Sequence, residues 1–331
     1  GVQFERPFPV MTFAEAMRDY GSDKPDLRYG LKLRDATGLF TEGGFPPFVE
    51  AAGRGENVVG LRVPGGSGYS RKVIDELSAI VRPLGVFGLV WVKIGDEGIT
   101  SSAKKDIAGD FAEKLAGHFG AERGDIILLA SGPTLKVQTA LGRVRQQVAQ
   151  AEGMIPEGQF VALWVTEFPL FDVDEETGAI VPMHHPFTGI LPEDASLLET
   201  EPMKVRGRLY DLVINDQEIA SGSVRIFDPN LQARVLEAIG IGDEEAEKRF
   251  GFFLEALKFG TPPHCGIAFG FDRMVMQLCN TDSITDVIAF PKTTAASCLM
   301  TGAPSAVDEK ALSELGLCLV DSAAADEGED S

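Results

Sequence analysis

The tightest constraint on the fold is the dipeptide Asn215-Asp216, which separates two strand-like runs at 210–214 and 217–226. Asparagine and aspartate tolerate the left-handed backbone that short turns require, so the two runs are predicted to pair as a β-hairpin. Helical patterns follow at 228–239, which opens on an Asp-Pro cap, and at 243–257. Strands paired by hairpins and interrupted by helices predict an α+β fold with an antiparallel sheet and argue against a doubly wound one.

The region before this hairpin differs in its sequence pattern. Thr12-Phe13-Ala14-Glu15 has the spacing of a capping box and predicts a helix that ends at Gly21. From about residue 29 to 131, glycine-rich turns separate short strands and helical runs such as 71–81, and this pattern predicts a compact α+β module. The loop 64–68 lacks the lysine and the spacing of phosphate-binding loops, so a turn before a capped helix is favoured there.

Length and charge narrow the function. With 331 residues the chain exceeds one ordinary core, so more than one domain is expected. Fifty acidic and thirty basic residues give a net charge of −20, which argues against nucleic-acid binding through a basic face but leaves a local basic patch open. Four cysteines without a CxxC pair suit a reducing compartment. With no membrane-length apolar run and no recognisable secretory signal, we expect a cytoplasmic protein without membrane or DNA partners.

Adjacent histidines form the first candidate group. His184 and His185 precede Pro186, so they are expected in an extended, loop-like segment. Imidazole titrates near neutral pH and can hydrogen-bond an anionic substrate. From the residues alone, a loop histidine bonded to backbone is the favoured interpretation, and binding of an anionic substrate is the alternative.

The hairpin carries the second candidate group. Asp211 and Glu218 lie on its two arms, and we expect them to face each other across the strands. Two carboxylates in this arrangement suit Mg²⁺, which also holds substrate phosphates. Arg225, seven residues beyond Glu218, could grip a carboxylate with its guanidinium fork. The alternative is a solvated strand face with a surface ion pair.

The third candidate group lies where a strand runs into a glycine turn and a helix, at 266–273. The glycines allow close approach of the backbone to a ligand, and Arg273 beside a helix N-terminus is well placed for phosphate. By spacing alone, an ordinary strand-turn-helix with an exposed arginine remains open.

Taken together, these segments resemble one family, the bacterial-type aspartyl-tRNA synthetases, which are class II aminoacyl-tRNA synthetases. The similarity runs over nearly the whole chain. The matching segments, in chain order, are residues 6–9, 20–28, 164–171, 183–188, 222–225, 259–264, 266–273 and 286–294.

The resemblance implies a class II antiparallel sheet flanked by helices, here incomplete, with an inserted α+β module called GAD. The expected domains are a catalytic segment at 1–29, the GAD module at 30–140, a catalytic part with motif 3 at 141–320, and an acidic flexible tail at 321–331. The implied reaction is ATP-dependent activation of L-aspartate to aspartyl-adenylate, followed by transfer of the aspartyl group to the 3′ end of tRNA.

The resemblance also implies roles for individual residues. Arg273 corresponds to the motif 3 arginine on the ATP γ-phosphate, and Glu218 would serve ATP and its Mg²⁺ together with Asp211. These two, Arg273 and Glu218, are the expected catalytic residues. The rest of the ATP contact would come from Gly270, Phe271 and Asp272. The expected aspartate ligands are His184 and Arg225.

The sequence also departs from the family pattern. No match to the family's anticodon-binding domain, to motif 1 of the dimer interface or to motif 2 is found, so we expect a C-terminal part that does not form adenylate alone. Ala220 and Ser221 replace frequent glycines, and Glu167 replaces a frequent aspartate. The resemblance implies a homodimer for the full-length enzyme and leaves tRNA-Asp alone, or with tRNA-Asn, open. The alternative functions are a non-catalytic synthetase-like paralogue and a GAD-containing binding module of the tRNA-amidotransferase type.

Overall fold

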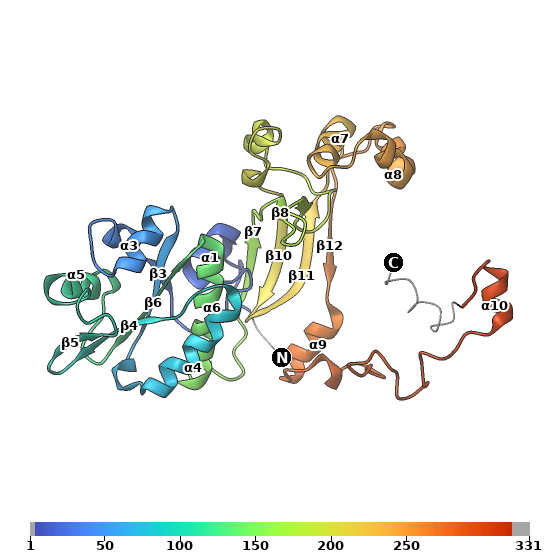
Figure 1. Ribbon diagram of the computed structural model, residues 1–331. Helices are drawn as coiled ribbons and strands as arrows, with labels where there is room; N and C mark the ends of the chain where they lie inside the picture. Colours follow the sequence, from blue (N-terminus) through green and yellow to red (C-terminus); the bar gives the residue numbers. More distant parts are fainter. Residues whose placement is uncertain (1–3, 320–331) are drawn as a thin grey trace, which may run out of the picture. The chain divides into compact units, whose positions relative to one another are not determined.

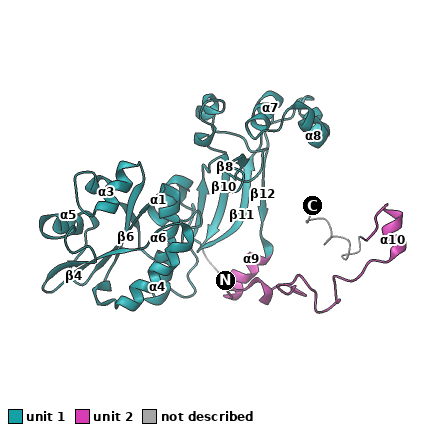
Figure 2. Cartoon of the chain, viewed as in Figure 1, with its two compact units in different colours: residues 1–271 teal, residues 272–331 magenta. Residues whose placement is uncertain are grey.

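The computed structural model of the protein describes residues 4–319 (Figure 1). The chain forms two compact units, residues 1–271 and 272–331, and the boundary follows the first residue of helix α9, Phe271–Cys279 (Figure 2). The predicted α+β class, with antiparallel sheets flanked by helices, is confirmed.

The first unit contains a five-stranded sheet that carries the hairpin. Its strand order is β1-β7-β10-β11-β12, where β10 and β11 are the arms joined at Asn215 and Asp216. The strands are β1 (Val10–Thr12), β7 (Ala162–Thr166), β10 (Leu209–Ile214), β11 (Gln217–Val224) and β12 (Cys265–Phe269). Asn215 has a φ of 59°, so it adopts the left-handed turn conformation that the sequence predicts. The sequence predicts an antiparallel sheet, and one strand pair departs from this prediction, because β1 pairs in parallel with β7.

A second five-stranded sheet in the same unit has the order β2-β3-β6-β4-β5, and each of its pairs is antiparallel. Its strands are β2 (Leu33–Asp35), β3 (Asn57–Val63), β4 (Val90–Gly95), β5 (Gly98–Ser101) and β6 (Ile126–Gly132). They fall inside the range expected for the GAD module, whose boundaries and identity stay a prediction.

Helices cover both faces of this second sheet because side chains along β3 and β6 alternate between two apolar clusters. Leu61 and Leu128 point to the face covered by α4 and α6, whereas Val58 and Leu129 point to the face covered by α2, α3 and α5. The helices are α2 (Thr37–Phe40), α3 (Pro46–Gly53), α4 (Arg71–Val81), α5 (Gly109–Phe119) and α6 (Thr134–Ala151). Alternating burial on both faces is what a sheet between two helical layers requires.

Helix α1 (Phe13–Tyr20) crosses α6 at two glycines. Thr12 and Glu15 form the predicted capping box, and the helix ends at Gly21, whose φ is 66°. A Cβ on Gly142 of α6 would lie 2.2 Å from the carbonyl oxygen of Gly21, so only glycine fits at this crossing. The segment before the second sheet is therefore fixed directly on the helix that follows that sheet.

The rest of the first unit surrounds the β10–β11 hairpin. A two-stranded ribbon, β8 (Phe171–Val173) with β9 (Ile180–Pro182), precedes the loop of the paired histidines. Two helices, α7 (Pro229–Ala238) and α8 (Asp243–Leu257), stand where the sequence predicts them, and Asp228 caps α7 as expected. Short 3₁₀ turns occur at Gly66–Gly68, Arg82–Leu84, Pro192–Leu197 and Pro202–Lys204.

The second unit consists of α9, a 3₁₀ turn at Ile284–Asp286 and helix α10 (Glu309–Glu314), joined by irregular segments. The expected acidic tail at 321–331 lies outside the described residues. In the part of the chain that the structure describes, no helix is long and apolar enough to cross a membrane.

Candidate functional site

The hairpin places Asp211 and Glu218 on one face of the sheet, but not opposite each other. Asp211 pairs with Ser221, and Glu218 pairs with Val213, because the register shifts after Leu212. The prediction of a direct facing pair is therefore wrong. The register shift is a β-bulge, which leaves Ile219 of β11 without a partner on β10. Without the bulge Glu218 would pair with Ile214 and point to the face of the sheet opposite Asp211, because side chains alternate along a strand.

Asp211 is the most deeply buried acid of this site, with 1% of its surface exposed. Burial raises the pKa of its carboxyl group, and the negative charge of Glu218 raises it further, whereas the Ser221 hydroxyl and His184 lower it. Its Oδ1 atom is buried and has no hydrogen-bond partner among the described residues. An orphaned buried acceptor is costly in a folded protein, so this atom has unused capacity for a proton or a cation.

Glu218 points toward the loop that follows α1. Lys24 Nζ lies 3.7 Å from Glu218 Oε2 and 3.4 Å from Asp23 Oδ2. Asp23 also acts on Asp211, whose pKa its charge raises. The loop 22–24 therefore adds one cation and one carboxylate to the two acids of the hairpin.

His185, rather than His184, contacts Arg225. Arg225 Nη1 lies 2.5 Å from His185 Nε2 and 3.1 Å from His185 Nδ1, and the backbone nitrogen of Phe187 lies 3.2 Å from Nδ1. Burial, together with the charge of Arg225, lowers the pKa of His185 to about 4, so the imidazole is neutral at pH 7 and can accept from the guanidinium. His184 is exposed, and its ring packs edge-on against Phe168 at 5.4 Å between centroids.

Arg225 forms no ion pair with a carboxylate among the described residues, which distinguishes it from Arg206 nearby in sequence. Arg206 is held by Asp194 at 2.9 Å and by Glu167 at 2.7 Å. The Arg225 main chain is fixed by its N–H bond to the His264 carbonyl at 2.9 Å. A half-buried guanidinium with a neutral partner retains its full charge for an anionic ligand.

The end of β12 lies beside the hairpin. The N–H of Gly270 donates to the Ile219 carbonyl at 2.7 Å, and the strand packs so closely on Gly222 that a Cβ there would lie 2.2 Å from the Gly266 carbonyl. The Phe271 side chain is exposed. Asp272 and Arg273 occupy the first turn of α9, as predicted, and belong to the second compact unit.

The donor set at the hairpin fits Mg²⁺ that arrives with a phosphate ligand. Mg²⁺ in such sites takes one or two carboxylates, with phosphates and water completing the shell, and Asp211 and Glu218 supply two. The buried Asp211 Oδ1 is an acceptor that such a cation could satisfy. Among the described residues no cluster of three metal-binding side chains occurs, so the protein alone offers no closed metal cage.

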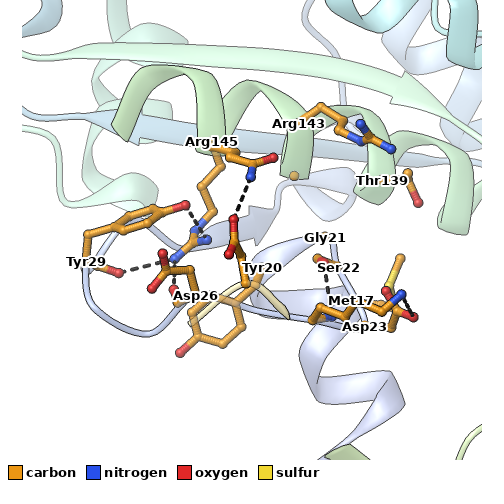
Figure 3. Close-up of a pocket in the computed structure, with 14 residues that line it drawn as sticks. Met17, Tyr20, Gly21, Ser22, Asp23, Asp26, Tyr29, Thr139, Arg143 and Arg145 are labelled. Atoms are coloured by element: carbon orange, nitrogen blue, oxygen red, sulfur yellow. Dashed lines mark hydrogen bonds and ion pairs between the residues drawn. The ribbon is translucent and has the colours of Figure 1, made fainter. Parts of the chain in front are cut away.

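A polar cavity of about 240 Å³ adjoins the loop 22–24 (Figure 3). Lys24, which contacts Glu218, lines it together with the exposed Arg143 of α6. One wall is the buried Arg145, whose guanidinium donates to the carbonyls of Asp26 and Leu31 at 2.7 and 2.5 Å. Arg145 therefore holds the 26–31 segment in place, and with it the loop that faces Glu218.

Sequence reasoning missed Asp23 and Lys24 as site residues, and of the two candidate histidines it gave a role to His184 and none to His185. Lys24 and Glu218 lie 194 positions apart, so no local pattern could join them. The sequence signal for Asp23 and Lys24 was the segment 20–28, which resembles the family but whose residues were given no functional role. The pairing of Arg225 with the second histidine of the pair had no sequence signal, since both histidines precede the same proline.

Comparisons with known proteins identify relatives of this chain by sequence. The family model described as tRNA synthetases class II (D, K and N) matches residues 1–294. The aspartate–tRNA(Asp/Asn) ligase of Natranaerobius thermophilus is 43% identical over 317 residues, which cover 96% of this chain and 54% of that protein. The aspartate–tRNA ligase of Lysinibacillus sphaericus is 42% identical over 320 residues, with the same coverage. The chain thus spans about half the length of the curated relatives it matches.

Solved structures give a much weaker match. An aspartyl-tRNA synthetase from Entamoeba histolytica is 20% identical, with a TM-score of 0.32, over 47% of this chain and 26% of that one. A TM-score this low does not establish a shared arrangement.

Proposed function

The chain belongs to the class II tRNA synthetases of the D, K and N type, and from this premise we propose that it carries active-site residues of an aspartate–tRNA ligase. The observation that carries the proposal is Arg225, a half-buried guanidinium held by a neutral imidazole and without a carboxylate partner among the described residues. Such a group selects a ligand with a carboxylate side chain.

The proposed reaction has two steps. The α-carboxylate of aspartate attacks the α-phosphorus of ATP, the bond to the bridging oxygen breaks, and pyrophosphate leaves. A hydroxyl of the tRNA 3′ end then attacks the activated carbonyl, the ester forms, and AMP leaves. Negative charge develops on phosphoryl oxygens, so catalysis depends on positioning and on fixed positive charge.

In this proposal different residues of the site bind the amino acid and the nucleotide. Arg225 binds the side-chain carboxylate of aspartate, and His184 covers the amino acid from its exposed loop. Glu218 and Asp211 would hold Mg²⁺, which supplies positive charge to the phosphates when it is bound. Lys24 keeps the Glu218 carboxylate oriented until the nucleotide arrives.

The ATP contact would continue at the junction of β12 and α9. Gly270, Phe271 and Asp272 would approach the nucleotide, and Arg273 would bind the γ-phosphate. The exposure of this segment supports its access to a ligand. A glycine before a helix lets the backbone come close to phosphate, as many phosphate-binding turns do.

The remaining partners follow from the family. We propose tRNA-Asp as the nucleic-acid substrate and leave tRNA-Asn open, since the relatives carry both kinds of name. A homodimer and a cytoplasmic location stay predictions. A non-catalytic binding module is not favoured, because the relatives that match 96% of the chain are named as ligases.

The test is aspartate-dependent ATP–pyrophosphate exchange by the product of the complete reading frame. We expect exchange with aspartate and at least about 100-fold less with asparagine, because an amide gives Arg225 no charged, bidentate partner. Arg225→Gln should lower kcat/KM for aspartate by about 100-fold or more. Equal exchange with both amino acids, or exchange that survives Arg225→Gln, would refute the proposal.

A further inference from the structure

The second sheet carries a basic cavity that the proposed active site does not use. Its volume is about 480 Å³, and Lys32, Arg34 and Arg62 line it together with one acid, Asp19. The chain as a whole has a net charge of −20, so a cavity lined by three basic side chains differs in sign from the average charge of the protein. We propose that this cavity binds the phosphate backbone of RNA, and the inference rests on the proposed function in which tRNA is the substrate.

The pairing of β2 with β3 brings Arg34 and Arg62 close together. Arg34 of β2 pairs with Gly60 of β3, two positions before Arg62, so the two arginines lie on one face of the strand pair. Gly60 is required there, because a Cβ would lie 2.4 Å from the ring of Phe119, which also lines the cavity. Like charges on neighbouring strands repel, so their gathering favours an anionic ligand.

The surrounding charges leave Arg34 as the open binding group. Lys32 pairs with Asp19 at 3.1 Å, and Arg62 is held by the buried Asp125 at 2.6 Å. Glu122 lies at the outer edge, 4.0 Å from Arg62, and Arg18 contacts Asp19 from the other side. Arg34 makes one hydrogen bond, to the His118 carbonyl at 2.5 Å, and no ion pair with a described residue. Four of its five N–H donors therefore remain for a ligand.

The chemistry of the cavity favours a backbone phosphate over a base or a small anion. Its aromatic ring, Phe119, is 3% exposed and offers no stacking face. Arg34 and Lys32 are exposed, as is typical of side chains that hold nucleic-acid phosphates without reading sequence. A dedicated site for a free phosphate more commonly uses a helix N-terminus or a backbone nest.

The test compares tRNA binding by two charge-matched double variants of the full 331-residue chain. Lys32→Gln with Arg34→Gln removes two charges at the cavity, and Arg71→Gln with Lys72→Gln removes the same two residue types from the exposed surface of α4. Fluorescence anisotropy with a labelled tRNA-Asp transcript is measured between 50 and 200 mM KCl. We expect the cavity variant to bind about 10-fold more weakly, with a salt slope smaller by about 1–2, and the α4 variant to match the wild type.

Three results would overturn the inference. One is unchanged affinity and salt slope in the cavity variant, with its fold verified by circular dichroism. Another is an equal loss in the α4 variant, which would reflect net charge alone. The third is binding of inorganic phosphate that the cavity variant abolishes while tRNA affinity is unchanged, which would identify a small-anion site. ATP–pyrophosphate exchange needs no tRNA, so its failure would count against the proposed ligase without affecting this result.

Discussion

Arg225 contacts the imidazole of His185, with 2.5 Å between Nη1 and Nε2 and 3.1 Å between Nη1 and Nδ1. The histidine serves as a neutral acceptor because burial and the guanidinium charge lower its pKa to about 4. The pair thus orients the arginine without neutralising it. A carboxylate in the place of His185 would fill the fork with a permanent ion pair, as Asp194 and Glu167 do at Arg206.

The first prediction concerns the pH dependence of stability through His185. The unfolded chain protonates this histidine below pH 6.5, whereas the folded chain does so only near pH 4. Between these values the unfolded state binds more protons, so the free energy of unfolding falls as the pH drops. We expect a contribution of about 1–2 kcal/mol after solvent screening of the half-buried ring.

Urea unfolding at pH 7, 5.5 and 4 measures this contribution when wild type is compared with His185→Gln. The wild type should lose more stability over this range than the variant, whatever their difference at pH 7. Parallel losses in the two proteins would show that His185 titrates normally.

The second prediction concerns the crossing of α1 and α6. Gly142→Ala should destabilise the chain by about 1–3 kcal/mol, since its Cβ would lie 2.2 Å from the Gly21 carbonyl and neither backbone can yield freely. Gly117→Ala in α5 is the matched control, with no atom within 4 Å of the added Cβ. That change should be neutral or stabilise by up to about 1 kcal/mol, because alanine favours the helix. Equal midpoints in denaturant for the two variants would contradict the packing at this crossing.

The third prediction concerns the buried arginine of α6. Arg145→Met should cost about 2–4 kcal/mol, because it leaves the carbonyls of Asp26, Tyr29 and Leu31 without their donor. Arg143→Met, two positions away on the exposed side of the same helix, should change stability by less than about 0.5 kcal/mol. Thermal or urea unfolding checks both variants, and a tolerated Arg145→Met would mean that other groups hold the 26–31 segment.

The fourth prediction concerns Lys24 and Glu218. Lys24 orients the Glu218 carboxylate, so Lys24→Met should misplace that carboxylate and raise the KM for ATP–Mg²⁺ several-fold in the exchange assay of the complete gene product, with a smaller effect on kcat. Lys24→Arg should restore most of the loss because it keeps the charge. An unchanged KM in Lys24→Met would exclude Lys24 from orienting the carboxylate.

Local patterns predicted much of the fold. The capping box at Thr12, the turn at Asn215-Asp216 and the cap at Asp228 each rest on contacts within a few residues, and each is confirmed. Long-range pairing was not predicted: β1 joins β7 in parallel across about 150 residues, for which the sequence holds no local signal.

In the candidate site, too, local features were predicted from the sequence and long-range ones were not. Sequence reasoning selected Asp211 and Glu218, but it missed the bulge at Ile219 that turns Glu218 to the face of Asp211. Ile219, the residue of β11 that the register shift leaves unpaired with β10, is 1% exposed, and no local sequence pattern marks it as a bulge. Roles for the individual site residues stay predictions until they are measured.

The most direct test of the central claim is selectivity between two non-hydrolysable adenylate analogues, aspartyl- and asparaginyl-sulfamoyl adenosine. They differ only in a side-chain carboxylate against an amide, so their affinity ratio for the chain reports on Arg225, and calorimetry measures both. We predict at least about 100-fold tighter binding of the aspartyl analogue, and a ratio within a few-fold of one in Arg225→Gln. Equal affinity in the wild type, a ratio that survives Arg225→Gln, or no binding of either analogue would contradict an aspartate pocket at this arginine.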